Sequence, residues 1–174
     1  MRIPEITSRE QIADDKRHVW DDIVASRGSV RGPFRAMLHS PELAERVARL
    51  GTYIRFQSQL DPHIRELATL ATARTLDCEY EASAHEAAMR DAGFPEETLT
   101  ALREKRFGDL PAEDRWIGAF VQQALTKHRV DNDTLAQAQQ RVGTQGVVEL
   151  AGTIGYYALL AVTLNTFEVS ASAV

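Results

Sequence analysis

Two dipeptides in which a capping residue precedes proline, Ser40-Pro41 and Asp61-Pro62, divide the chain into helical segments. Ser and Asp accept hydrogen bonds from the free N–H groups at a helix start, and proline fits best at the first helical position. The first pair is followed by apolar residues at spacings of four, three and four, from Leu43 to Ile54, which is the period of a helix. The two pairs therefore predict helices that begin at Pro41 and Pro62.

Similar start and stop signals recur along the rest of the chain. Ser8 and Gln11 form a capping box that opens a segment ending at Gly28, and Asp77 is expected to cap a helix that ends at Gly93. No segment alternates with period two, so the sequence predicts an all-α bundle. Further helices are expected at 96–104 and 113–127, from Asp131 or Asn132 to Val142, and from Thr144 onward.

The glycine inside one of these helices predicts a close contact. Gly51 lies in the middle of the apolar run that starts at Leu43. Glycine costs a helix interior up to ~1 kcal/mol relative to alanine. We therefore expect another helix to cross closely at Gly51.

Composition limits the class of protein and its partners. The 174 residues are enough for one domain with a core, and 44% of them are hydrophobic. The net charge is −5 and no basic stripe is visible, so nucleic acid is not expected as a partner. The N-terminus has no apolar signal region, and the single cysteine, Cys78, cannot form an intramolecular disulfide, so we expect a cytoplasmic protein.

The most apolar stretch, Val147–Phe167, approaches the length of a membrane span. It contains Glu149 and Asn165, and no Lys/Arg cluster flanks it to set an orientation. A helix that is apolar on all sides can equally form the centre of a bundle or an oligomer interface. We expect a buried helix and no membrane association.

The segment from Cys78 to His85 holds the residues that could carry chemistry. If Asp77 is the cap, Cys78 lies in the first helical turn, where the helix dipole favours a thiolate. Glu79 and Glu81 act in the opposite direction, so the sequence leaves the acidity of the thiol open. His85 points within ~20° of Cys78 but lies ~10 Å along the helix, so we expect no direct contact between them. Glu81 is four residues before His85, a spacing that permits a hydrogen bond.

A second carboxylate is expected from the preceding helix. Glu66 is eleven residues before Asp77, and His85 is eight residues after it. In an antiparallel helical hairpin, Glu66 would lie at the height of His85. A carboxylate on a packed face needs a partner, and His85 is the candidate.

The other reactive side chains have simpler interpretations. Cys78 could be a small buried hydrophobe and Glu81 a solvated acid. Arg74 could contact an anionic substrate, although an exposed salt bridge is the preferred interpretation. Glu81 and His85 are only two ligands, so no metal site is predicted. We interpret four histidines as surface or packing residues and two tyrosines as core residues: His18, His39, His63, His128, Tyr156 and Tyr157.

These residues resemble the motif of the carboxymuconolactone decarboxylase and alkylhydroperoxidase D superfamily. Its peroxidase branch has a glutamate, then twelve residues later a C-x-x-C pair with a histidine four residues after the second cysteine. Glu66, Cys78 and His85 stand at the glutamate, first-cysteine and histidine positions, and Glu81 replaces the second cysteine. Flanking segments such as 40–44, 65–68 and 148–157 extend the resemblance over residues 33–168.

The resemblance implies one AhpD-like helical domain over residues 1–174, with a core at 33–168 and an N-terminal helical extension at 1–32. It also implies a homotrimer or hexamer with the site near a subunit interface. The site residues carried over are Glu66, Cys78, Glu81 and His85, and no cofactor is implied.

Three functions are compatible with this motif. The first is acid–base decarboxylation or isomerisation of a small organic acid or lactone, with His85 moving the proton, Glu66 orienting it, and Glu81 or Cys78 contacting substrate. The second is a one-cysteine thiol peroxidase that needs an external thiol, because the chain has no second cysteine to resolve a sulfenic acid on Cys78. The third is a non-catalytic oligomeric binding protein.

Overall fold

The computed structural model describes residues 1–170, and these contain helices and no strands. The predicted all-α class is therefore confirmed. Short 3-10 turns occur at Arg9–Gln11, Asp14–Lys16 and Phe107–Asp109, and a π-helical turn follows α7 at Gln123–Lys127. The α-helices are α1 (Arg17–Arg27), α2 (Pro33–Met37), α3 (Pro41–Phe56), α4 (Pro62–Thr75), α5 (Glu79–Asp91), α6 (Glu96–Arg103), α7 (Arg115–Gln122) and α8 (Asn132–Phe167).

Most helix boundaries agree with the sequence signals. Pro41 and Pro62 are the first residues of α3 and α4, and the Asp61 side chain accepts a hydrogen bond from the His63 amide. The segment from Ser8 to Gly28 is an exception, because its capping box closes only a 3-10 turn and α1 starts at Arg17. The chain is extended at Ile12, which places this side chain in the core and interrupts the helix.

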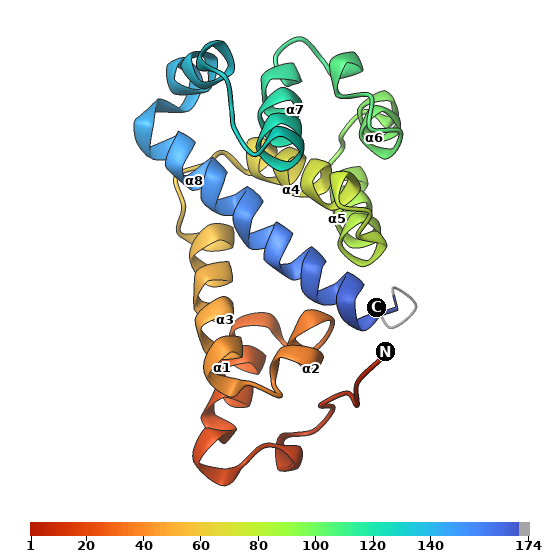
Figure 1. Cartoon of the computed structure of the whole chain (residues 1–174), viewed down its shortest axis with the longest axis vertical. Coiled ribbons are helices and arrows are strands. Elements are labelled where there is room, and N and C mark those ends of the chain that lie inside the picture. Colours follow the sequence, from red (N-terminus) through yellow and green to blue (C-terminus); the bar gives the residue numbers. More distant parts are fainter. Residues whose placement is uncertain (171–174) are drawn as a thin grey trace.

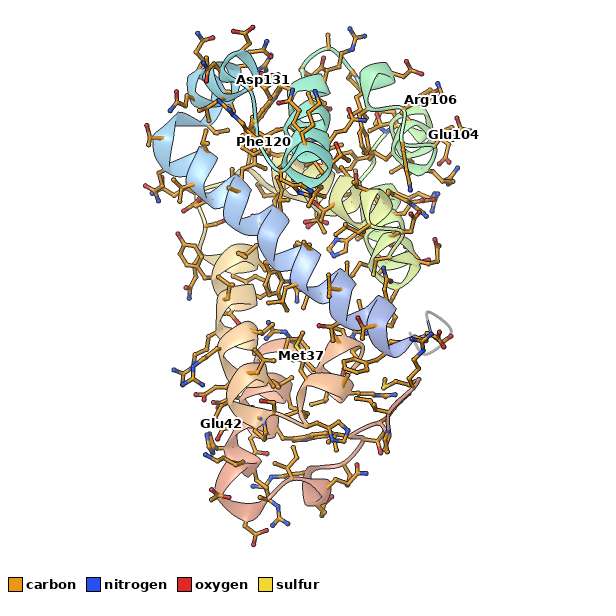
Figure 2. All side chains as sticks on the ribbon, in the orientation of Figure 1. Met37, Glu42, Glu104, Arg106, Phe120 and Asp131 are labelled. Carbon is orange, nitrogen blue, oxygen red and sulfur yellow. The ribbon has the colours of Figure 1, made fainter. Side chains whose placement is uncertain are left out.

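Helix α8 separates two groups of helices. In Figure 1 it runs diagonally across the molecule, with α1, α2 and α3 on one side and α4 to α7 on the other. One apolar core is built from α4 to α7 and the first part of α8, and the other from α1 to α3 and the last part of α8. Figure 2 illustrates both: Met37 and Phe120 lie inside, whereas Glu104 and Arg106 lie at the periphery.

The composition of α8 follows from this position. By length and composition alone α8 could cross a membrane, but 56% of its most apolar window is buried inside the protein. Its path changes at Gly143, whose backbone is non-helical with φ 68°. The sequence predicted two helices that meet between Val142 and Thr144, and this break is confirmed.

A buried carboxylate links α8 to α3 and to the loop after it. Glu149 is 7% exposed, and it accepts hydrogen bonds from the Tyr53 hydroxyl at 2.6 Å and the Gln59 amide at 2.7 Å. Gln145 donates a third hydrogen bond at 3.1 Å. These donors offset the cost of removing the charge from water.

The close helix crossing expected at Gly51 is confirmed. A Cβ atom at Gly51 would lie 2.2 Å from the Tyr156 hydroxyl oxygen on α8 and 2.7 Å from the Arg27 guanidinium. Only a residue without a side chain lets α3 approach both groups. The crossing brings α1, α3 and α8 together at one point.

We expect Gly51→Ala to lower the free energy of unfolding by about 1–3 kcal/mol, because overpacking outweighs the better helix propensity of alanine. Gly152→Ala on α8 is the matched control, since a Cβ there would meet nothing within 4 Å. This control should raise the free energy of unfolding by up to about 1 kcal/mol. Urea unfolding measures both changes, and equal effects of the two substitutions would contradict the crossing.

Candidate active site

The hairpin of α4 and α5 brings Glu66 and His85 together. The two helices pack against each other, and His85 Nδ1 lies 2.8 Å from Glu66 Oε2. The contact predicted from the sequence is therefore confirmed. This hydrogen bond fixes the orientation of the ring and keeps a proton on Nδ1.

A second carboxylate and an aromatic ring hold the other side of the imidazole. His85 Nε2 lies 3.5 Å from Glu81 Oε2, one turn earlier on α5. The ring of Tyr157 on α8 meets the imidazole edge to face, with centroids 5.1 Å apart. Because the Glu81 contact is longer than the Glu66 contact, the Nε2 proton is the more available of the two.

These surroundings control the charge of His85. Burial disfavours the imidazolium, but hydrogen bonds with Glu66 and Glu81 outweigh this effect and raise the pKa of His85 to about 9. Burial likewise opposes ionisation of Glu66, yet its hydrogen bond to His85 and the nearby Arg65 and Arg55 lower its pKa. His85 is thus a protonated acid at neutral pH, paired with an ionised Glu66.

The imidazole faces a cavity of about 360 Å³. This volume is within the range of small-molecule sites, roughly 300–1,000 Å³. Glu66, Glu81 and His85 line it together with residues of α1, α2, α3 and α8 and the loop before α2. Most of the other lining residues are aromatic or basic: Phe34, Tyr80, Tyr156, Tyr157, Arg27, Arg31 and Arg55.

Sequence reasoning missed most of these walls. Tyr156 and Tyr157 are buried, as expected of core residues, but they also line the cavity. Arg27 and Arg31 belong to the segment interpreted as an extension, and Arg55 is more than twenty residues further along the chain. No local motif links these positions, because only the packing of α1 and α3 brings them to one cavity.

Cys78 does not share the cavity. It is the residue before the first turn of α5, in place of the expected Asp77, and its backbone is non-helical with φ −93° and ψ 87°. The expected alignment of Cys78 with His85 assumed helical geometry, so it fails at this position. The thiol is 1% exposed within the apolar core of α1 to α3 and is absent from the cavity lining.

Burial also decides the acidity of the thiol. It raises the pKa of Cys78 to about 11, with a further contribution from the charge of Glu81. The backbone N–H groups of Glu81 and Tyr80 act in the opposite direction but do not compensate. The sequence left this balance open, and the structure gives a protonated thiol at neutral pH.

His63 is a surface residue whose ring packs on Phe94, as interpreted, and its Nε2 also lies 3.0 Å from the buried Asp114. The interpretation of Arg74 as an exposed salt bridge needs correction. Arg74 forms ion pairs with Glu79 and Glu86, but its side chain is only 13% exposed. Three arginines around Glu86 lower its pKa to about 2 despite its burial, so this is a structural charge cluster away from the cavity.

A second hollow of about 540 Å³ lies between α1 and α3, and its walls contain no histidine or cysteine. No group of three or more His, Cys, Asp or Glu side chains in residues 1–170 is arranged to hold a metal ion.

The fold is the AhpD-like helical fold. The chain superimposes on the crystal structure of an alkylhydroperoxidase AhpD core, an uncharacterized peroxidase-related protein from Ralstonia eutropha JMP134, with a TM-score of 0.77. The two sequences are 18% identical, and the match covers 97% of this chain and 90% of the other.

The sequence comparison agrees with the fold. Residues 41–107, which include Glu66, Glu81 and His85, match the profile of the Carboxymuconolactone decarboxylase family. A comparison with curated proteins finds no significant match. The family match over residues 41–107 and the AhpD-like fold both agree with the resemblance seen in the motif.

We expect the His85 imidazole to titrate near pH 9 in NMR spectra of the folded protein, against 6.5 for an ordinary histidine. Because the folded pKa is the higher one, the stabilisation is complete below pH 6.5 and is lost as the pH rises through about 9. His85→Gln should remove this dependence, and Glu66→Gln should lower the pKa of His85. His18→Gln, at an exposed histidine, is the control. A His85 pKa at or below 6.5 would contradict the arrangement.

Proposed function

We propose that this protein is a cytoplasmic enzyme that performs acid–base chemistry on a small organic acid or lactone, of the decarboxylase or isomerase kind. The observation that carries the proposal is the His85 imidazole, which Glu66 holds through Nδ1 in the wall of a cavity of small-molecule size and whose pKa is raised to about 9. An acid that is charged at neutral pH and held in one orientation suits proton transfer to substrate. The basic and aromatic walls support an organic anion as the substrate.

The geometry suggests how a decarboxylation would proceed. The C–C bond to the departing carboxylate breaks, CO₂ leaves, and the electron pair stays on the substrate carbon in conjugation with a carbonyl group. His85 Nε2 donates its proton to that carbon and becomes a neutral imidazole that retains the Nδ1 proton toward Glu66. The neutral ring then regains a proton from water, and the Glu81 carboxylate, 3.5 Å from Nε2, lies where it can accept that proton from water and pass it to Nε2. An isomerisation would use the same two positions to remove and return a proton.

A thiol peroxidase is the second candidate, and the description of the Ralstonia eutropha protein as peroxidase-related favours it. In that reaction the Cys78 thiolate attacks the peroxide oxygen, releases the leaving oxygen as an alcohol or water, and becomes a sulfenic acid that an external thiol must reduce. The burial of Cys78 and the raised pKa of its thiol weigh against this candidate.

We expect His85→Gln and Glu66→Gln to reduce turnover by about 10²–10⁴-fold, the usual contribution of a positioned acid or base. Cys78→Ser should retain most activity, and serine is also a preferred residue at a helix N-cap, so the variant should fold. Turnover assays on small lactones and unsaturated carboxylic acids, with circular dichroism as a folding control, measure these effects.

The outcome of Cys78→Ser separates the candidates. Complete loss of activity in a folded Cys78→Ser variant, together with sulfenic acid trapped on Cys78 after peroxide treatment, would replace the acid–base proposal by the peroxidase. Ligand binding without turnover in the unmodified protein would instead indicate a non-catalytic binding protein.

We also propose that the chain forms a homo-oligomer through α3 and α8. These two helices pack against each other, and large apolar side chains on both remain exposed. Phe56 is 63% exposed on α3, and Val148 and Val162 are 66% and 61% exposed on α8. Apolar side chains gathered on neighbouring helices are typical of protein interfaces, and a second copy of the chain carries the same surface.

Val148→Glu is therefore expected to shift the protein toward monomer, because a charge would be buried in the contact. Gln140→Glu introduces the same charge at an exposed polar position of α8 and should leave the assembly unchanged. Light scattering coupled to size-exclusion chromatography measures the mass. A monomeric unmodified protein, or an assembly unaffected by Val148→Glu, would contradict this interface.

A further inference from the structure

One wall of the cavity comes from a segment that precedes the region matching the family profile. Ser29 and Arg31 line the cavity from the loop between α1 and α2, ahead of residues 41–107. Val30, between them, is 6% exposed and packs in the core of α1 to α3. This buried anchor fixes a short loop whose neighbouring side chains face the cavity.

Glycine makes the approach of this loop to the cavity possible. Gly32 has φ 57° and ψ −129°, a conformation that is essentially restricted to glycine. A Cβ atom there would lie 2.8 Å from the ring of Tyr80, another residue of the cavity wall. The loop is therefore held against Tyr80, and Arg31 is kept beside the cavity.

The arginines of the cavity differ in how their guanidinium groups are used. Arg27 donates to the Ala48 carbonyl at 2.8 Å and to the Ser26 hydroxyl at 2.8 Å, and it stacks on Phe34. The guanidinium groups of Arg31 and Arg55, in contrast, form no hydrogen bond or ion pair within the described part of the chain, although that of Arg55 lies over the Phe56 ring, 5.0 Å from its centroid. Arg27 thus supports the wall, while two cations remain available to a ligand.

The balance of charge in the cavity points to an anionic ligand. Three arginines and His85 face two carboxylates there, although the whole chain carries a net charge of −5. A locally positive hollow in an acidic protein concentrates anions and disfavours cations. Aromatic side chains on the remaining walls suit a flat organic group.

We propose that Arg31 and Arg55 determine the specificity of the cavity by holding the anionic group of the substrate. This inference rests on the proposed function, and it assigns substrate recognition to the loop before α2 and to the end of α3, while proton transfer belongs to α4 and α5. The charge of Arg55 acts on Glu66 and Tyr157, and the charge of Arg31 acts on Tyr80, so the two arginines are placed near different parts of the cavity wall. Both are specificity residues, and neither exchanges protons with the substrate.

The test compares benzoate with benzamide, a neutral molecule of nearly the same shape, by isothermal titration calorimetry at low salt. The unmodified protein should bind benzoate more tightly than benzamide. Arg31→Gln and Arg55→Gln should each weaken benzoate binding roughly tenfold or more, since each removes a charged contact, and should leave benzamide binding unchanged. Arg46→Gln on the exposed side of α3 is the matched control and should change neither affinity.

Binding and turnover distinguish this inference from the proposed function. The proposed role of Arg31 and Arg55 in anion binding is overturned by any of three results. These are equal affinities for benzoate and benzamide, no binding of benzoate, or an unchanged affinity for benzoate in both arginine variants. His85→Gln should retain the preference for benzoate over benzamide while it loses turnover. Turnover retained in His85→Gln would overturn the acid–base function alone, and the benzoate results would still decide the role of Arg31 and Arg55.

Discussion

The fold depends on the burial of α8, which is shared by two apolar cores. Its first part packs with α4 to α7 through residues such as Leu150, and its last part packs with α1 to α3 through residues such as Leu164. The contact of Gly51 with Tyr156 and the hydrogen bonds of Glu149 fix α3 against this helix. The cavity is lined by residues of α1 to α3, of α4 and α5, and of α8, so the candidate site depends on how α8 is held between the two groups of helices.

Burial has opposite consequences for the two reactive groups of the motif. Both Cys78 and His85 are removed from water, which disfavours the charged form of each. His85 has Glu66 and Glu81 as partners and stays protonated. The Cys78 thiol lies among apolar side chains, and the negative charge of Glu81 disfavours its thiolate further. Glutamate at position 81, where the peroxidase motif that this chain resembles has a cysteine, therefore supports the proposed proton transfer by the imidazole rather than thiol chemistry.

The cavity combines two parts of the chain with different roles. The region that matches the family profile provides Glu66, Glu81 and His85, the proposed proton-transfer group. The loop before α2, which lies outside that region, provides Arg31 and closes one wall against Tyr80. Chains that share the proton-transfer group could thus differ in substrate through this loop alone.

Signals in the sequence were enough to predict the helical class, the starts of α3 and α4, the crossing at Gly51 and the pairing of Glu66 with His85. These features follow from local rules, because capping residues, proline and helical periodicity act over a few residues. A helical hairpin, in addition, makes neighbours of residues that are equally far from its turn. The burial of Cys78 away from the cavity, and the positions of Arg31 and Arg55 in its wall, became visible only in the folded protein. Burial and charge at these positions are set by residues far away in the sequence, and no local spacing contains that information.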